Sequence, residues 1–314
     1  MTRILVATEK PFAKVAVDGI RKIVEDAGFE LALLEKYQEK AQLLAAVAAA
    51  DALIVRSDLI DRDVVAAAKQ LKIVVRAGAG YDNLDLAACS AAGIAAMNTP
   101  GQNANAVAEL AIGLMIMAAR NNFDGSSGTE LLGRKLGVHA YGNVGRRVAT
   151  VAKCLGMQVF AYDPFVPAPR IEAEGIAVLP SVSDLYASCQ YVSLHVPADD
   201  KTKKSINHDL VVRMPKGATL VNTARAEIID EEGLLRVMAE RPDFKYYSDI
   251  SPKHREPWQE FAARAFFTPK KMGAQTAEAN INAGLAAARQ IVGFIDKGDR
   301  AFLLNAQALE RRPA

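Results

Sequence analysis

The chain has 314 residues, 51% of them hydrophobic, which is long enough for two domains with well-filled cores. Its net charge of +2 gives no overall drive toward nucleic acid or an anionic membrane, so we expect neither as a partner. The three scattered cysteines form no CxxC pair, and we recognise no signal-peptide pattern and no apolar run of membrane-spanning length. We therefore expect a cytoplasmic protein without a disulfide framework or a metal site.

The first hundred residues alternate short β-like runs with helix-like stretches. The runs are Ile4–Ala7, Ala52–Val55 and Ile73–Val75, and alanine-rich helical patterns cover Gln42–Ala50 and Asp63–Gln70. Short β-branched runs that alternate with helices indicate a parallel sheet with helices on its faces. This part is expected to form one lobe.

A second alternating series follows a break of turn residues near 98–103. A long apolar helix is expected from Ala104 to about Arg120, and a final helix from Ala277 to about Asp296 returns to the first lobe. The expected strands of the second lobe are near Lys135–Ala140, Val159–Asp163, Tyr191–Val196, Thr219–Asn222 and Tyr246–Ile250. We expect an α/β protein of two doubly wound parallel-sheet lobes, with domains 1–98 (completed by 275–314) and 99–274.

The stretch after Lys135 carries a degenerate dinucleotide fingerprint. It reads Ala140-x-Gly142-x-x-Gly145, with alanine in the place of the first glycine. Gly142 lets the backbone approach a pyrophosphate, Gly145 lets the helix pack close to the sheet, and the helix start at Asn143 and Val144 offers free N–H groups. Alanine at position 140 is tolerable if the turn keeps a negative φ.

The next expected strand ends in an acidic residue whose sequence separation from Gly142 is informative. Asp163 lies 21 residues after Gly142. A carboxylate at that spacing binds the adenosine ribose hydroxyls and repels a 2′-phosphate, which favours NAD over NADP. The alternative is that Asp163 only starts the Asp163-Pro164 turn.

Several segments together resemble the D-isomer-specific 2-hydroxyacid dehydrogenase family, and within it the phosphoglycerate dehydrogenases that lack a C-terminal regulatory domain. Besides the fingerprint, the segments are Val55–Ser57, Arg76–Asp85, Met97–Pro100, Ala108–Leu110, His195–Pro197, Val221–Arg225, Glu256-Pro257 and Thr268-Pro269. The resemblance implies a Rossmann-like cofactor lobe, a flavodoxin-like substrate lobe, an active site in the cleft between them, and a homodimer. The 121–133 segment is shorter than in many relatives, which leaves the oligomeric state open.

The resemblance also implies residue roles. Arg225 is expected to bind the substrate carboxylate, since a guanidinium can hold it with two parallel hydrogen bonds. The backbone N–H groups of the loop Ala77–Gly80, Ala77 and Gly78 among them, are expected to bind the carboxylate from the other side, although Gly78 and Gly80 could be plain turn glycines. Further cofactor contacts are expected from Ala79, His195, Val196, Pro197, Thr223, Ala224 and Asp249.

This chain lacks the acid–base histidine that members of the family carry. Relatives place it directly after a Thr-Pro pair, where this chain has Lys270, and a glutamate that would orient it is present as Glu256. We expect Lys270 to be the acid–base group and Lys271 to be a solvated loop lysine. Because free lysine titrates near ~10.4, hydroxy-acid oxidation should improve at alkaline pH. The competing hypothesis is a catalytically silent NAD-binding regulatory protein.

Among the four histidines of the chain, one is an alternative to Lys270 as the acid–base group. His139 lies within an expected strand and is interpreted as structural, His195 is expected near the cofactor, and His208 is interpreted as a surface residue. His254 precedes Glu256 by two residues and is the only alternative to Lys270.

Two arginines suggest the substrate. Arg56 and Arg76 each end an expected strand of the first lobe, and Ser57 stands beside one of them. Together they could hold a phosphate, which favours oxidation of D-3-phosphoglycerate, the first step of serine biosynthesis, over glyoxylate or hydroxypyruvate reduction. The alternative is that either arginine pairs with a structural acid such as Asp58 or Asp82.

Overall fold

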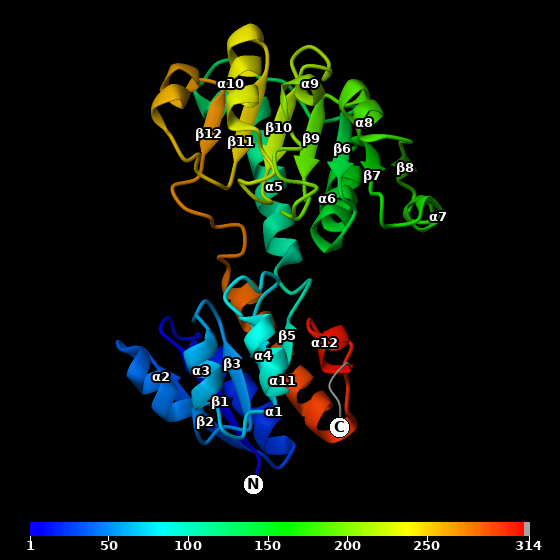
Figure 1. Cartoon of the computed structure of the whole chain (residues 1–314). Helices are drawn as coiled ribbons and strands as arrows, with labels where there is room; N and C mark the ends of the chain where they lie inside the picture. Colours follow the sequence, from blue (N-terminus) through cyan, green and yellow to red (C-terminus); the bar gives the residue numbers. More distant parts are fainter. Residues whose placement is uncertain (311–314) are drawn as a thin grey trace. The chain divides into compact units, whose positions relative to one another are not determined.

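The computed structural model describes residues 1–310. The chain forms two compact units (Figure 1): unit 1 is Met1–Asn103 together with the segment from Gln275 onward, and unit 2 is Ala104–Ala274. The sequence predicts the first boundary slightly earlier, after residue 98. Residues 99–103 belong to unit 1, where the Thr99 N–H donates to the Gly78 carbonyl at 3.0 Å. Residues 311–314 of the expected first domain lie outside the described residues.

Unit 1 is built on a five-stranded parallel sheet with the strand order β2-β1-β3-β4-β5. The strands are β1 (Arg3–Thr8), β2 (Glu30–Glu35), β3 (Ala52–Val55), β4 (Ile73–Arg76) and β5 (Ala95–Asn98). The helices are α1 (Lys14–Asp26), α2 (Lys40–Val47), α3 (Arg62–Ala67), α4 (Leu86–Ala92), α11 (Ala277–Lys297) and α12 (Ala306–Glu310).

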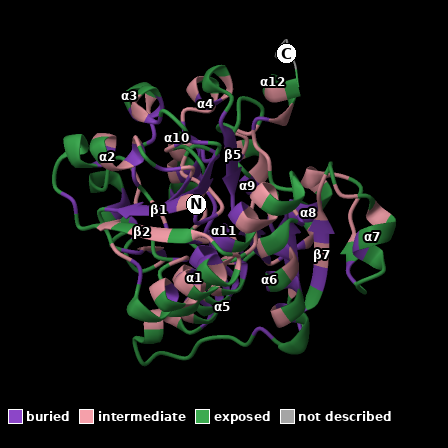
Figure 2. Ribbon diagram, turned by 90° about the horizontal axis from the view of Figure 1, so that it is seen from below, coloured by how far each residue is buried: buried purple, intermediate pink, exposed green. Residues whose placement is uncertain are grey.

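The alternation of side chains along each strand supplies apolar residues to both faces of this sheet. Ile4 and Val6 of β1 pack with α1 and α11, whereas Leu5 and Ala7 pack with α2, α3 and α4. Figure 2 shows buried residues along β1 and β5, and mixed exposure along the edge strand β2. Helices therefore cover both faces of the sheet.

Unit 2 is built on a seven-stranded parallel sheet with the order β12-β11-β10-β9-β6-β7-β8. Its strands are β6 (Lys135–His139), β7 (Gln158–Tyr162), β8 (Ala177–Val178), β9 (Tyr191–Leu194), β10 (Thr219–Asn222), β11 (Lys245–Ser248) and β12 (Ala265–Phe267). Its helices are α5 (Ala104–Ala119), η1 (Asn121–Phe123), α6 (Asn143–Cys154), α7 (Ala168–Glu172), α8 (Val182–Ser188), α9 (His208–Val211), α10 (Glu231–Glu240) and η2 (Glu256–Phe261).

The second sheet also has helices on both faces. Buried residues of α5, α6 and α7 form one core with it, and buried residues of α8, α9, α10 and η2 form the other. No helix within residues 1–310 is both long and apolar enough to cross a membrane.

The strand orders identify where ligands are expected. In unit 2 the chain runs outward from β6 through β7 to β8, and then outward in the other direction from β9, so β6 and β9 meet at a switch point. In unit 1 the switch point lies between β1 and β3, and the order is that of flavodoxin-like sheets. Open parallel sheets bind ligands beyond the carboxyl ends of their strands at such points. The expected fold class is confirmed.

Candidate functional site

The turn between β6 and α6 holds one alanine in a left-handed conformation. β6 ends at His139, and α6 begins at Asn143 with Gly142 as its N-cap. Ala140 has φ +77°, so the condition of a negative φ, under which alanine would be tolerated without strain, is not met. A Cβ on Gly145 would overlap the carbonyl oxygen of Ala140, so glycine is needed for the helix to approach the turn this closely.

The first turn of α6 is open to an anion. Among residues 1–310, no side chain caps the helix, and a Cβ built on Gly142 would meet no atom within 4 Å. The N–H groups of Asn143, Val144 and Gly145 therefore lie at the positive end of the helix dipole beside open space. This arrangement suits the pyrophosphate of a dinucleotide.

Asp163 lies directly after β7 and beside the same turn. Its Oδ2 accepts a hydrogen bond from the Tyr141 N–H at 2.7 Å, and its Oδ1 accepts from the N–H groups of Phe165 and Val166 at 2.8 and 3.2 Å. The carboxylate therefore does start the Asp163-Pro164 turn. A carboxylate has about four acceptor positions, so this half-buried group keeps capacity for a ribose hydroxyl.

Two buried polar atoms that follow neighbouring strands have no hydrogen-bond partner among the described residues. They are Thr223 Oγ1, just after β10, and His195 Nε2, just after β9. Buried polar atoms without partners are uncommon in proteins and call for an explanation such as a missing ligand. Together with the uncapped start of α6, they fit a bound dinucleotide. Val196 is buried and Pro197 is exposed on the same loop.

A pair of histidines lies under this edge of the sheet. Burial lowers the pKa of His139 to about 4, and burial together with the neighbouring His139 lowers the pKa of His195 to about 3. The backbone N–H of His195 donates to the backbone carbonyl of His139 at 3.0 Å. The ring atom His139 Nδ1 lies 3.3 Å from the hydroxyl of Tyr186. Both rings are therefore neutral near pH 7, and His139 is a structural residue, as expected.

The Arg225 loop is fixed by a buried asparagine. Asn222, the last residue of β10, is fully buried; its Oδ1 accepts from the Ala224 N–H at 2.9 Å and its Nδ2 donates to the Arg225 carbonyl at 3.0 Å. The half-buried Arg225 side chain donates through Nη1 to the Ala224 carbonyl at 3.0 Å. The loop thus presents a guanidinium from a rigid strand end.

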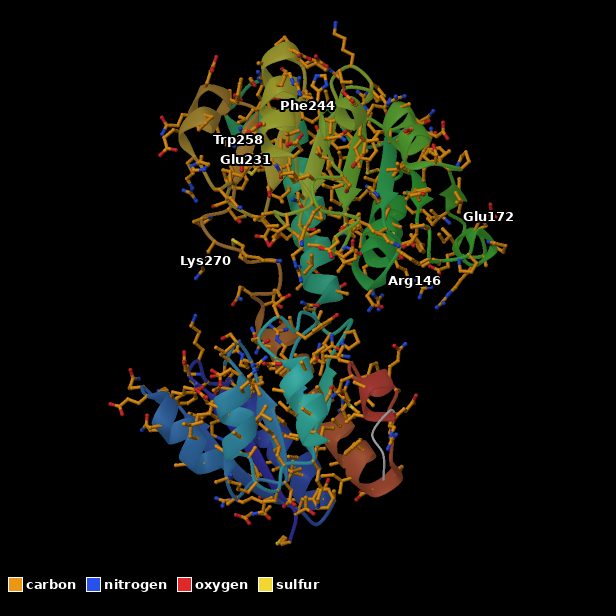
Figure 3. The ribbon with its side chains drawn as sticks, viewed as in Figure 1. Arg146, Glu172, Glu231, Phe244, Trp258 and Lys270 are labelled. Carbon is orange, nitrogen blue, oxygen red and sulfur yellow. The ribbon has the colours of Figure 1, made fainter. Side chains whose placement is uncertain are left out.

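The two lysines after β12 differ in their surroundings. Lys270 is exposed, and Figure 3 shows its side chain extending away from the strands. Lys271 is also exposed, as expected of a loop lysine, but its Nζ donates to the Ala224 carbonyl at 2.9 Å, a contact that the sequence did not indicate. The path of the loop explains the difference, because it brings Lys271 back against the loop that carries Arg225.

Asp249 holds the lysine loop. It follows β11, is fully buried, and accepts hydrogen bonds from Thr268 Oγ1 at 3.0 Å, the Met272 N–H at 2.9 Å and the Gly273 N–H at 2.7 Å. The cofactor contact expected of Asp249 stays a prediction. The structure adds that its carboxylate fixes the backbone on the C-terminal side of Lys271.

Glu256 and His254 lie together on an exposed stretch at the start of η2. Within residues 1–310, no hydrogen bond or ion pair connects Glu256 with Lys270. This segment is anchored instead by Trp258, whose indole N–H donates to Glu231 Oε1 at 3.0 Å (Figure 3). The orienting role of Glu256 therefore stays a prediction.

The predicted phosphate residues lie at the carboxyl edge of the first sheet. Arg76 ends β4, pairs in register with Val55 of β3, and donates through Nε to the Arg56 carbonyl at 3.0 Å. The Arg56 guanidinium donates to the carbonyls of Lys10 and Pro11 at 2.9 and 3.0 Å, and also to Asn280 Oδ1.

Ser57 is exposed beside these arginines. Asp58, which we had weighed as a possible partner of Arg56, is buried and accepts the Arg56 backbone N–H at 3.1 Å. The structure therefore gathers Arg56, Ser57 and Arg76 at one strand edge, with the Arg56 side chain engaged by protein acceptors.

The loop after β4 needs glycine at one position. Gly78 has φ +150°, and a Cβ there would overlap the guanidinium of Arg76. Asn98 Nδ2 donates to the Ala79 carbonyl at 2.6 Å, which ties the loop to β5. Ala77 and Gly78 are buried, and Ala79 is half-buried.

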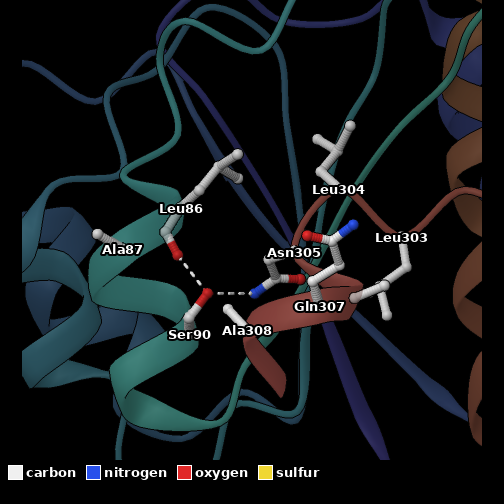
Figure 4. Close-up of a pocket in the computed structure, with 9 residues that line it drawn as sticks. Leu86, Ala87, Ser90, Leu303, Leu304, Asn305, Gln307 and Ala308 are labelled. Carbon is white, nitrogen blue, oxygen red and sulfur yellow. Dashed lines mark hydrogen bonds between the residues drawn. The ribbon is translucent and has the colours of Figure 1, made fainter. Parts of the chain in front are cut away.

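A surface pocket in unit 1 contains none of the expected site residues (Figure 4). Asn305 lies in its wall and donates through Nδ2 to Ser90 Oγ at 3.1 Å and to the Ile94 carbonyl at 3.0 Å. These hydrogen bonds attach the C-terminal segment to α4 and β5. The pocket is therefore a groove beside a structural contact.

Sequence reasoning missed the roles of Lys271, Asn222 and the Asp249 carboxylate in shaping the loops. The Lys270-Lys271 pair was a visible signal, but the choice between the two lysines depends on how the loop returns. The contacts of Asp249 are made to residues about twenty positions further on, which no local pattern marks.

Comparison with known proteins gives consistent matches. The family model described as D-isomer specific 2-hydroxyacid dehydrogenase, NAD binding domain, matches residues 111–269. The hydroxypyruvate reductase of Thermotoga maritima is 37% identical over 219 residues, which cover 65% of this chain and 70% of that protein. The D-3-phosphoglycerate dehydrogenase of Methanocaldococcus jannaschii is 35% identical over 269 residues, covering 80% of this chain and 51% of that protein. The chain thus spans about half the length of this second relative.

A solved structure is similar over almost the whole chain. The crystal structure of NAD⁺-bound 3-phosphoglycerate dehydrogenase from Entamoeba histolytica is 46% identical, with a TM-score of 0.86, and the match covers 97% of this chain and 98% of that one. The resemblance, the two-lobe fold and NAD as the cofactor, all expected from the sequence, are confirmed, and with them the assignment to the NAD-dependent dehydrogenases.

Proposed function

The chain belongs to the D-isomer specific 2-hydroxyacid dehydrogenase family, and from this premise we propose that it oxidises D-3-phosphoglycerate to 3-phosphohydroxypyruvate with NAD, the first step of serine biosynthesis. One observation carries the proposal. One parallel sheet carries all the groups at the ends of its strands: the open start of α6 follows β6, Asp163 follows β7, and the orphan Thr223 hydroxyl and the Arg225 loop follow β10. A dinucleotide and an anionic substrate can therefore bind at the same edge of the sheet.

The cofactor would be held by groups that the protein leaves open. The N–H groups of Asn143, Val144 and Gly145 suit the pyrophosphate, and Asp163 suits the adenosine ribose. Further contacts are proposed from Ala79, Gly142, His195, Val196, Pro197, Thr223, Ala224 and Asp249. When bound, NAD supplies the hydride acceptor for the C2–H bond of the hydroxy acid.

Arg225 would bind the carboxylate, and the backbone of Ala77 and Gly78 would contribute N–H groups to it. Lys270 would take the proton from the C2 hydroxyl in the oxidation and return it to the carbonyl oxygen in the reduction, with Glu256 orienting it. A neutral lysine is needed for the oxidation. Because free lysine titrates at about 10.4, the oxidation rate should keep rising above neutral pH.

The acid–base role is tested with Lys270→Met. We expect kcat to fall by about 100-fold or more, while the Kd for NADH stays unchanged. Full turnover by this variant would overturn the role of Lys270 and make His254 the candidate, which His254→Gln would then test. A pH–rate profile with a single basic limb near neutrality would also argue against a lysine.

The substrate is tested by comparing kcat/KM for 3-phosphohydroxypyruvate and hydroxypyruvate. Arg76→Met should lower kcat/KM by at least about tenfold for the phosphorylated substrate and much less for hydroxypyruvate, because a charged hydrogen bond is lost only with the former. Arg62→Met, which removes an exposed arginine of α3, is the matched control. Equal kcat/KM values of the wild type for both substrates would remove the phosphate role of Arg56, Ser57 and Arg76.

A second candidate is hydroxypyruvate or glyoxylate reduction. It is favoured by the Arg56 guanidinium, which the Lys10 and Pro11 carbonyls and Asn280 already engage. If Arg56 has a structural role, less positive charge remains at this strand edge to bind the phosphate of a substrate. The same side-by-side kinetics separate the two candidates, and NADH binding without turnover of any keto acid would favour the regulatory alternative.

We propose a homodimer assembled through unit 2 and located in the cytoplasm. Ile116, Phe123, Leu132 and Leu155 are large apolar residues of this unit that stay exposed in the single chain. Such side chains are often covered in an oligomer. Sedimentation analysis should give the mass of two chains, and the mass of one chain would refute the proposal.

A further inference from the structure

Two cationic side chains meet on one carbonyl oxygen. Ala224 O accepts hydrogen bonds from Arg225 Nη1 at 3.0 Å and from Lys271 Nζ at 2.9 Å. A carbonyl oxygen has two lone pairs, so these two donors fill it. The guanidinium and the ammonium therefore lie side by side, and like charges held together favour a nearby anion.

Both cations are held by buried polar side chains at the ends of adjacent strands. Asn222 ends β10 and pairs in register with Ser248 of β11, and Asp249 follows directly. Asn222 fixes the Arg225 loop, and Asp249 binds the backbone just after Lys271. The register of these two strands thus brings Lys271 to the Ala224 carbonyl.

Binding of a carboxylate to Arg225 affects the hydrogen bonds that the Ala224 carbonyl oxygen accepts. The Arg225 guanidinium has five N–H donors, and an acid that binds across its Nη1 and Nη2 atoms competes with Ala224 O for Nη1. Ala224 is buried, being 9% exposed, and a buried acceptor that loses its donor opposes the change. A second donor on the same oxygen removes this penalty.

We propose that Lys271 is a positioning residue for Arg225: it keeps the Ala224 carbonyl hydrogen-bonded while the guanidinium turns to the carboxylate of the substrate. The inference rests on the proposed function, since it uses Arg225 as the carboxylate ligand. It separates the two lysines by role, with Lys270 in proton transfer and Lys271 in the binding of the acid.

The test compares Lys271→Met, which removes the donor, with Lys271→Arg, which restores one. The probe is oxamate, a 2-keto acid isostere, titrated calorimetrically into the NADH-saturated full chain. Steady-state kinetics with 3-phosphohydroxypyruvate and hydroxypyruvate accompany the titration. Lys216→Met is the matched control, because Lys216 is an exposed lysine of unit 2.

Lys271→Met should weaken oxamate binding and raise the KM for the keto acid by about tenfold, the effect of losing one charge-assisted hydrogen bond. Its kcat and its Kd for NADH should stay close to those of the wild type. Lys271→Arg should recover most of the binding, and Lys216→Met should match the wild type.

Three results would overturn the inference: wild-type oxamate affinity in Lys271→Met, equal impairment of the Met and Arg variants, or a loss confined to kcat. The last would place Lys271 in proton transfer. If the wild type binds oxamate but turns over no keto acid, the proposed function fails while the affinities still decide the role of Lys271. If the wild type turns over a keto acid but does not bind oxamate, the KM values of the Met and Arg variants decide the role of Lys271.

Discussion

The carbonyl oxygen of Ala140 occupies the space that a side chain on Gly145 would need. Ala140 itself has φ +77°, a conformation in which its own Cβ is crowded. The start of α6 is thus brought against the turn by one residue without a side chain and by another held in an unfavourable conformation. The two positions should respond to substitution in opposite directions.

Replacing Ala140 with glycine should stabilise the protein. Glycine adopts a positive φ without steric cost, so the strain of about 1 kcal/mol at this position is removed, although the greater freedom of glycine in the unfolded chain offsets part of the gain. Urea unfolding should show a higher midpoint at an unchanged m value. A lower midpoint would show that Ala140 is relaxed in its conformation.

Gly145→Ala should destabilise the protein and weaken NADH binding. The new methyl group would overlap the Ala140 carbonyl, so α6 must move away from the turn and the N–H groups at its start move with it. We expect a loss of about 1–3 kcal/mol in the free energy of unfolding, together with a higher Kd in a fluorescence titration with NADH.

The matched control for that substitution is Gly113→Ala. Gly113 is an exposed residue within α5, and a Cβ on it would meet nothing within 4 Å. Alanine is a better helix former than glycine by up to about 1 kcal/mol, so this variant should be as stable as the wild type or more stable. Equal behaviour of the two alanine variants would contradict the close approach at Gly145.

Acid should destabilise the protein through its buried histidines. The pKa values of His139 and His195 are lowered to about 4 and about 3 from 6.5, so below pH ~6.5 the unfolded chain binds protons that the folded chain excludes. The stability is fully present above the unfolded value and is lost as the pH falls toward 4. For His139 alone the loss approaches about 3 kcal/mol at pH ~4.

Urea unfolding at several pH values between 7 and 4 measures this loss. His139→Phe removes one titrating group and should flatten the profile relative to the wild type, even if its stability at pH 7 is lower. A wild-type free energy of unfolding that stays constant over this range would refute the assignment of neutral buried rings.

The sequence predicted most elements whose apolar runs coincide with a buried strand, but it missed β5 (Ala95–Asn98), which is buried along its whole length. Ala52–Val55 and Thr219–Asn222 have the expected bounds because each is buried along its whole length. β2 was missed since it is an edge strand with glutamate at both ends and mixed burial. β8 and β12 were missed because two or three residues carry no periodicity.

The proposed cofactor site could be predicted for a similar reason. Gly142, Gly145 and Asp163 lie at fixed spacings within one strand–helix–strand unit, so the chain order alone brings them together. The contact between Lys271 and Ala224 joins residues 47 positions apart and depends on how two loops return. Local patterns carry no signal for such a contact, so the sequence did not predict it.

The last prediction concerns Asp249, which binds the lysine loop through three hydrogen bonds. Asp249→Ala would leave two backbone N–H groups and the Thr268 hydroxyl without their acceptor in a buried place. Because each unsatisfied buried group costs about 1–3 kcal/mol, we expect a loss of several kcal/mol in the free energy of unfolding unless the loop opens to water. Either outcome frees the backbone beside Lys271.

Hydrogen exchange of the Met272 and Gly273 amides measures that release directly. Both should exchange much faster in Asp249→Ala than in the wild type. In the variant these amides no longer donate to a carboxylate, so their exchange does not require a hydrogen bond to break first. Thr268→Val removes only the hydroxyl contact, costs about 1 kcal/mol, and should leave both amides protected. Protection that persists in Asp249→Ala would mean that other contacts hold the loop, and the role of Asp249 in placing Lys271 would have to be abandoned.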